Sequence, residues 1–433
     1  MTTSDSCQRQ TSTESQGRSR GEQGGGADPG LPAGGDLLAF SLMLFYLLST
    51  LTLALMAVVT DELQRKFGLS AAQVGLLTSA FMFTYGLVGI LAGAAAARWG
   101  GRVLAVSCAF FVVGSVIFAF SSSFAGFLGG RILQGLGGGM VLPVSSPVIA
   151  RFLSPEKRNR GWGVFASGKG LGSLAALLVM PSVASVGGVR AVFLVTAGLA
   201  AIIGTVTLVQ GPVRALPEED GQAIKLTALA SDLGAVAVNP KVLLLGLFNA
   251  ASLAVGTGVL VWTPDFLMER YGSSAGVAAY LTAGLALAQL LGAPSGAVAA
   301  ERWGRMPVII GAMAGMSVAA ALVGVAPGRG LVFVLVVLVG FFSLAYFSPR
   351  FAMIPEVVAR AEQVGPASGF INALGFTTSM LAPWLFGLAL DHGAGYVAGY
   401  LVLAAFGAAG VAGGFLFRSS QGPWQVSCGK GVH

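Results

Sequence analysis

The 433-residue sequence is short of charge, because only 10% of its residues are Asp, Glu, Lys or Arg, whereas 55% are apolar. A soluble chain carries about 25% charged residues. The mean hydropathy of +0.80 also lies outside the range of soluble domains. We therefore expect an integral membrane protein rather than two or three soluble domains.

Histidine and cysteine are too rare to build a catalytic or metal-binding constellation. The two histidines, His392 and His433, stand far apart in the sequence, and no paired carboxylates accompany them. The three cysteines, Cys7, Cys108 and Cys428, form neither a CxxC motif nor a disulfide framework. The expectation is a protein that is not an enzyme and that holds no cofactor and no metal.

A basic stripe and a signal peptide are also missing. The 25 basic residues exceed the 18 acidic ones by seven, but they are scattered singly between apolar runs, which argues against nucleic-acid binding. Residues 1–35 are rich in Ser, Gln, Gly and Arg and lack the apolar core of a signal peptide, so they predict a disordered cytoplasmic tail. Residues 417–433 are expected to form a second cytoplasmic tail.

Twelve apolar runs are long enough to cross a hydrocarbon core, which takes about 20 residues as a helix. They begin near Leu37, Gln73, Val103, Phe124, Trp162, Ala191, Val242, Ser273, Pro307, Gly330, Gly365 and Gly395. The 64 glycines suit such a bundle, because small residues let helix backbones approach closely in lipid. The predicted fold class is all-α integral membrane with twelve transmembrane helices.

The sequence repeats itself at about half its length. The residues that recur 204 positions apart are Asp61 with Asp265, Phe67-Gly68 with Tyr271-Gly272, and Arg98-Trp99-Gly100 with Arg302-Trp303-Gly304. Farther along, the offset contracts to 202, as in Ser146-Pro147 and Ser348-Pro349. Each half holds six spans, an even number, so the halves are parallel repeats and both Arg-Trp-Gly loops lie on one face of the membrane.

Two six-helix bundles are predicted over residues 36–211 and 241–416, joined by a cytoplasmic linker over 212–240. The linker contains a stretch near Ile224–Val236 that is typical of a short amphipathic helix. Placing the N-terminus in the cytoplasm assigns 18 Lys and Arg to that side and five to the other. This asymmetry predicts that both termini are cytoplasmic.

The loop after the second span carries Gly93, Arg98, Gly100 and Arg102. Together with the parallel six-plus-six repeats, this loop resembles the major facilitator superfamily, whose loop signature reads Gly-x-x-x-Asp-Arg-x-Gly-Arg-Arg. The acidic position of the signature is Ala97 here. The resemblance covers essentially the whole hydrophobic length of the chain.

The second copy of this loop keeps an acid, since it reads Glu301, Arg302, Trp303, Gly304 and Arg305. The resemblance implies that both loops latch the cytoplasmic helix ends through charge pairs and helix-end dipoles, and so act in gating. The alternative is that the arginines serve only as positive-inside anchors.

Two further motifs carry the resemblance. The fourth span contains Arg131-Ile132-Leu133-Gln134-Gly135-Leu136-Gly137, which is similar to the superfamily signature Arg-x-x-Gln-Gly-x-Gly. The seventh span ends in Trp262-Thr263-Pro264-Asp265-Phe266-Leu267, which resembles the anion:cation symporter and cyanate-permease-like branches. The fifth span lacks the Gly-Pro-x-x-Gly-Gly element of drug:proton antiporters. An anion carrier is favoured over a drug exporter.

Two cations, Arg131 and Lys169, are the charges that fall inside predicted spans, and no carboxylate lies in the middle of a span. An unpaired charge in the membrane costs at least about 2.5 kcal/mol, so a functional role is the default hypothesis for both. The alternative is that their side chains snorkel or cap carbonyl groups. Gln134 shares the helical face of Arg131. A positive interior favours anionic substrates.

Polar residues in the first, seventh and tenth spans, which line the cavity by resemblance, include Tyr46, Asn249 and Tyr346. They are substrate-binding candidates together with Arg131, Gln134 and Lys169, although each also suits a helix–helix hydrogen bond.

We expect a monomeric secondary carrier of the plasma membrane that moves a small organic or inorganic anion by alternating access, with a proton or sodium as the coupling ion. Two alternatives stay open. One is a multidrug or metabolite efflux carrier of the same fold, and the other is a non-transporting receptor.

Overall fold

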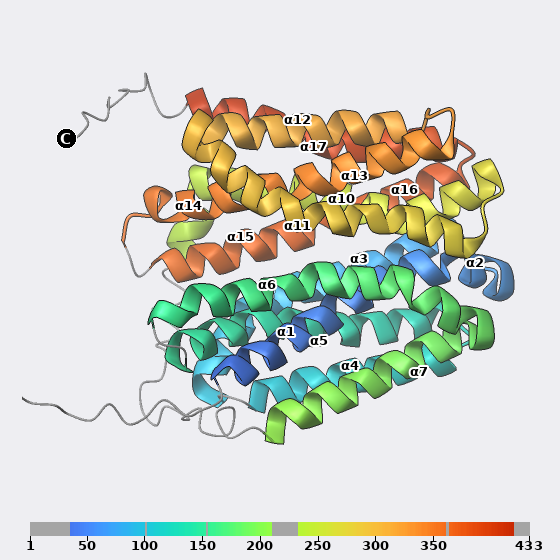
Figure 1. The fold of residues 1–433 in the computed structure, drawn as a ribbon, viewed down its shortest axis with the longest axis horizontal. Coiled ribbons are helices and arrows are strands. Elements are labelled where there is room, and N and C mark those ends of the chain that lie inside the picture. Colours follow the sequence, from blue (N-terminus) through green and yellow to red (C-terminus); the bar gives the residue numbers. More distant parts are fainter. Residues whose placement is uncertain (1–34, 100–101, 153–154, 210–232, 361–362, 420–433) are drawn as a thin grey trace, which may run out of the picture.

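The computed structural model describes residues 35–99, 102–152, 155–209, 233–360 and 363–419. Within these ranges the chain forms α-helices and short turns, without β-strands. The helices lie along one common direction and gather into two bundles, the first made by α1 to α7 and the second by α10 to α17 (Figure 1). The all-α prediction is confirmed.

The first bundle comprises α1 (Gly35–Ala54), α2 (Met56–Phe67), α3 (Ala71–Trp99), α4 (Arg102–Phe120), α5 (Phe124–Phe152), α6 (Pro155–Leu178) and α7 (Met180–Val209). The second comprises α10 (Pro240–Tyr271), α11 (Ala275–Trp303), α12 (Arg305–Val323), α13 (Arg329–Ala345), α14 (Phe347–Val357), α15 (Val364–Ser379), α16 (Leu381–Asp391) and α17 (Gly395–Ser419).

Twelve crossings follow from these helices, because α1 with α2, α13 with α14, and α15 with α16 each continue one another across a short break. Ten crossings within the described ranges are long and apolar enough to span a membrane. The other two are α5, which carries Arg131, and α6, which carries Lys169. The twelve-helix arrangement of two six-helix repeats agrees with the prediction.

The sixth crossing contains a kink at Gly188, whose φ of 61° and ψ of −159° lie outside the helical range. Glycine adopts a left-handed φ without steric cost. The Glu62 carboxylate accepts a hydrogen bond of 2.7 Å from the Val189 N–H and so caps the helix where it restarts. The apolar crossing over 189–209 therefore begins within two residues of the predicted Ala191.

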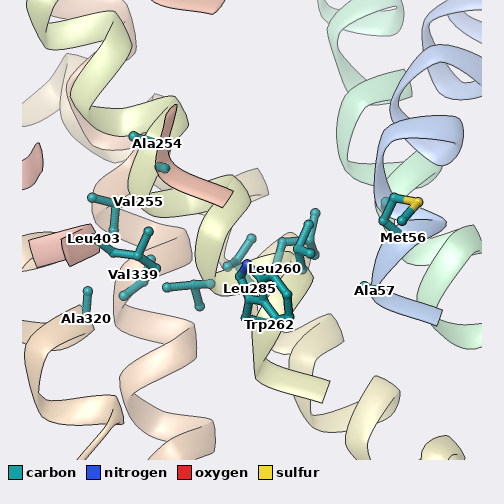
Figure 2. Close-up of a cluster of buried hydrophobic side chains, with 14 of the residues drawn as sticks. Met56, Ala57, Ala254, Val255, Leu260, Trp262, Leu285, Ala320, Val339 and Leu403 are labelled. Atoms are coloured by element: carbon teal, nitrogen blue, oxygen red, sulfur yellow. The ribbon is translucent and has the colours of Figure 1, made fainter. Parts of the chain in front are cut away.

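Buried apolar side chains fill both bundles. Figure 2 shows part of one cluster, in which Trp262 and Leu260 of α10 lie beside Leu285, while Met56 belongs to the other bundle. The Trp262 ring stacks on Phe386 at 5.2 Å and its Nε1 donates to the Pro383 carbonyl at 3.2 Å. Such packing and hydrogen bonding, rather than a hydrophobic drive, holds helices together in lipid.

Three predicted segments fall largely outside the described residues. The predicted tail over 1–35 is described only at Gly35. The predicted linker over 212–240 is described only at 233–240, where a short helix over 233–237 precedes the start of α10 at Pro240. At the other end, α17 continues to Ser419, so it extends three residues past the predicted bundle limit at 416.

Candidate functional site

The two bundles are hydrogen-bonded to each other at the end of the molecule where α3 begins and α16 finishes, which we call the Asp391 end. The two Asp391 carboxylate oxygens accept hydrogen bonds from the N–H groups of Ala71 and Ala72 at 2.9 and 2.8 Å. A carboxylate there satisfies free N–H groups at the start of α3 and complements the helix dipole. The Ser79 hydroxyl also donates to the Met380 carbonyl.

Glycines let α3 and α16 touch backbone to backbone at this end. A Cβ added at Gly75 would lie 2.8 Å from the carbonyl carbon of Pro383, and one at Gly387 would lie 2.6 Å from that of Ala71. Both distances are shorter than a Cβ tolerates. The Asp391 end is therefore closed.

Replacing Asp391 with Asn should weaken this closure. The amide keeps one acceptor oxygen but loses the charge that faces the α3 N-terminus, so we expect a loss of about 1 kcal/mol, or roughly fivefold in the population with this end closed. Spin labels at Ser70 and His392 would report the longer distance of the open state.

The matched control for that experiment is Arg418→Gln, which neutralises an exposed charge in the last turn of α17, far from the Asp391 end. It should leave the distance distribution unchanged. If Asp391→Asn also left it unchanged, the carboxylate would have no role in closure.

Arg131 is fully buried and joins three helices of the first bundle. Its Nη1 donates to the Thr52 carbonyl at 2.9 Å, and its Nε donates to the Leu77 carbonyl at 3.3 Å. Thr52 lies in the last turn of α1, where helix carbonyls lack intrahelical partners, so the cation caps the break before α2. The guanidinium also lies 4.5 Å over the Phe81 ring.

Gln134 belongs to the same network. Its Oε1 accepts from Arg131 Nη1 at 3.0 Å, and its Nε2 donates to the Ser115 hydroxyl at 2.9 Å. Arg131 Nη2 has no hydrogen-bond partner. The contacts of Nε and Nη1 match the carbonyl-capping interpretation of Arg131, and Nη2 is buried without a hydrogen bond to any described residue.

Lys169 points to the interior rather than to lipid. On α6, Gly168 and Gly172 face α1, while Gly170 faces Leu290 of α11 in the other bundle. Successive residues turn by about 100°, so Lys169 lies nearly opposite the exposed Leu171. Lys169 is half-buried, and its ammonium makes no hydrogen bond or ion pair with any described residue.

Three of the predicted polar residues make contacts inside their own bundles. The Tyr346 hydroxyl donates to Asn249 Oδ1 at 2.8 Å, and Asn249 Nδ2 donates to the Ile371 carbonyl at 3.3 Å. From the first bundle, Tyr46 stacks on Phe165 with ring centroids 4.8 Å apart. Tyr46 belongs to α1 of the first bundle and Tyr346 to the break between α13 and α14 of the second, so the two bundles each supply one tyrosine.

Arg350 is the residue that sequence reasoning missed, because it was counted among the basic residues of the cytoplasmic loops. The structure corrects this assignment. Arg350 lies in α14, is fully buried, and has three guanidinium nitrogens without a hydrogen-bond partner. Its position follows the repeated Ser-Pro pair, where the first copy has Val148. The sequence did offer one signal of a buried position for Arg350: the equivalent residue in the first repeat is apolar.

The predicted gating residues lie at the opposite end, which we call the Arg-Trp-Gly end. Gly93 and Arg98 lie in α3, Arg102 begins α4 and is exposed, and Gly100 lies outside the described residues. Gly304 has a φ of 84° between α11 and α12. Glu301 and Arg302 are exposed.

Arg305 pairs with Glu356 of α14 rather than with the acid of its own loop. Its Nη1 also donates to the Ala352 carbonyl at 3.3 Å. Both side chains are about half exposed, so this ion pair contributes at most about 1 kcal/mol. It links α12 to α14 within the second bundle.

Comparison with known families decides the class of protein. The model of the Major Facilitator Superfamily matches residues 38–295 and 257–427. The chain belongs to the Major Facilitator Superfamily. It is accordingly a multi-pass membrane transporter and not an enzyme, as the sequence predicted.

Relatives of this superfamily member include a putative niacin/nicotinamide transporter of Bacillus subtilis, 28% identical over 328 residues, which are 75% of this chain and 78% of the relative. Two shorter matches span only 27% of the relative. They are an uncharacterized MFS-type transporter of Bacillus subtilis, 31% identical over 34% of this chain, and the probable anion transporter 4 of Arabidopsis thaliana, 29% identical over 32% of it.

Solved structures of the superfamily share the fold. A bacterial homologue of the lysosomal transporter Spinster, in an inward-facing and occupied conformation, has a TM-score of 0.71 at 18% identity and covers 89% of this chain and 96% of its own. A D-xylose-proton symporter has a TM-score of 0.67 at 18% identity, with 88% and 96% covered.

Proposed function

We propose that this transporter moves a small organic or inorganic anion by alternating access. The observation that carries the proposal is Lys169, a cation that points from α6 toward the second bundle and has no partner among the described residues. A charge inside a membrane protein is costly unless it is paired or hydrated. An anionic substrate would supply the missing partner.

Tyr46, Asn249 and Tyr346 would complete the substrate contacts. The two bundles would each supply one tyrosine, and the Asn249 amide holds the Tyr346 hydroxyl in place through the 2.8 Å hydrogen bond. Tyrosine hydroxyls can donate hydrogen bonds to an anion. Arg131 and Gln134 would act from the wall of the first bundle, since Nη2 of Arg131 has no hydrogen-bond partner among the described residues.

Rocking of the two bundles would expose this site to each side in turn. The closed Asp391 end would open as the Arg-Trp-Gly end closes, with Arg98, Arg102, Arg302 and Arg305 governing the second step. The first helix begins and the last helix ends at the Arg-Trp-Gly end (Figure 1). Both helix ends at one face support termini on the same side of the membrane, which in this proposal is the cytoplasmic side of the plasma membrane.

The carrier would work as a monomer, because each site is built from the two bundles of one chain. Its coupling ion would be a proton or sodium. A pH gradient and a sodium gradient, imposed separately on proteoliposomes, would distinguish the two.

Counterflow in proteoliposomes tests the proposal. Nitrate, benzoate, succinate and phosphate should be compared with the lipophilic cation tetraphenylphosphonium, and we expect exchange of anions only. Lys169→Gln should lower anion exchange at least tenfold, whereas Lys241→Gln at the start of α10 should not change it. Exchange of the cation without any anion would favour an efflux carrier, and no exchange at all would favour a receptor.

A further inference from the structure

Arg350 is a buried cation that the described protein leaves without a counter-charge. Its Nε, Nη1 and Nη2 are all buried and unpartnered, and its surroundings are aromatic. The guanidinium carbon lies 4.5 Å from the Phe351 ring centre and 5.5 Å from those of Tyr346 and Phe347. Ring faces offset part of the cost of burying a cation, but they satisfy none of its N–H donors.

Lys169 of the first bundle lies near Arg350. Residues next to Lys169 and next to Arg350 both contact α11, so the positions of these contacts along α11 show how far apart the two cations lie along the helix axis. Gly170, next to Lys169, faces Leu290, whereas Ser348, two residues before Arg350, donates to the Ala293 carbonyl at 3.0 Å. Leu290 and Ala293 are separated by about 4.5 Å along the helix axis. Both side chains therefore lie at about the same level of α11, and their like charges interact unfavourably.

Two neighbouring cations in a low-dielectric interior are unfavourable without an anion between them. We infer that Lys169 and Arg350, one from each bundle, form a single site for a small dianion such as a dicarboxylate or a phosphate. The inference rests on the proposed anion transport and deepens it, because it names the charge of the substrate and adds Arg350 to its contacts.

The chemistry of the two side chains fits different parts of such a ligand. Arginine presents a planar fork that binds two oxygens of a carboxylate or phosphate, while lysine acts as a point charge. A monoanion would neutralise one of the two charges and leave the other unpaired. A dianion neutralises both.

The placement on opposite bundles also links binding to rocking. Without a ligand, repulsion between Lys169 and Arg350 pushes the bundles apart on this side of the interface. A bound dianion reverses the sign of the interaction and draws the bundles together. The empty carrier therefore resists closing around this site, and exchange of one dianion for another should be faster than net flux.

Thermal unfolding of the purified full-length carrier tests the site without transport. Arg350→Gln should raise the unfolding temperature in the absence of anions, because it removes an uncompensated buried charge. Succinate or phosphate should raise the unfolding temperature of the wild type. Arg350→Gln and Lys169→Gln should need at least a tenfold higher anion concentration for the same rise. A lowered unfolding temperature with an unchanged response to succinate would overturn the inference.

Counterflow separates this inference from the proposed function. Succinate or phosphate should compete with labelled substrate at least tenfold better than benzoate, and the preference should vanish in Arg350→Gln but not in Arg329→Gln, which neutralises an exposed arginine. If anions are exchanged with no preference for dianions, the two-cation site is wrong while anion transport stands. If no anion is exchanged by the wild type, both fail.

Discussion

Valine at Gly75 is expected to hold the Asp391 end open and to reduce transport at least tenfold, without unfolding either bundle. The added side chain would overlap the backbone at Pro383 and Trp384, which belong to the other bundle. Backbone atoms cannot move aside as a flexible side chain can, so the bundles must separate. Gly387→Val should have the same effect from the other side, through Ala71.

The matched control is Gly276→Val, because Gly276 lies near the start of α11 and a Cβ there would meet nothing within 4 Å. It is the same Gly→Val substitution in a membrane-spanning helix, made where the added side chain has room. Counterflow would report the loss of transport, and spin labels at Ser70 and His392 the open end. Full transport by Gly75→Val would mean that the contact between α3 and α16 is not part of the cycle.

Lysine at Arg131 is expected to lower both the stability of the first bundle and the transport rate. One ammonium group cannot reach the Thr52 and Leu77 carbonyls together in the geometry of the guanidinium fork. A hydrogen bond to a charged group contributes about 1.5–3 kcal/mol, so the unfolding temperature should fall by several degrees. Transport per folded carrier should fall at least tenfold, because the Nη2 donor goes too.

Expressing flux per folded molecule separates the two roles of Arg131. Arg329→Lys, the same change at an exposed site, should alter neither stability nor flux. If Arg131→Lys destabilises the carrier but keeps full flux per folded molecule, Arg131 does not anchor the substrate and its role is to bridge α1, α3 and α5.

The crossings could be predicted from the sequence because the length and apolar composition of each run already indicate that it lies in the membrane. Length and hydropathy are local, so twelve crossings and the parallel repeat follow without tertiary information. The breaks within crossings were harder to see. The kink at Gly188 lies inside the segment assigned to α7, with no break in the apolar pattern to mark it. Leu55 likewise separates α1 from α2 inside one continuous apolar run.

Arg350 illustrates where local reasoning fails. Proline on both sides, at positions 349 and 355, makes the segment look like a loop end, and a charge beside proline is usually solvated. In the structure both prolines lie within the helix α14, and the arginine is buried under three aromatic rings. Which way its side chain points depends on helices far away in sequence.

The sequence by itself determined that this chain is a twelve-crossing membrane protein of two parallel repeats with unmatched cations in its first half, since composition and spacing are written along the chain. Only the tertiary structure decided which of those cations are already occupied. Arg131 is bound by carbonyl oxygens of α1 and α3, whereas the Lys169 ammonium has no hydrogen bond or ion pair with any described residue. Pairing of charges depends on which helices pack together, and packing is a property of the folded bundles alone.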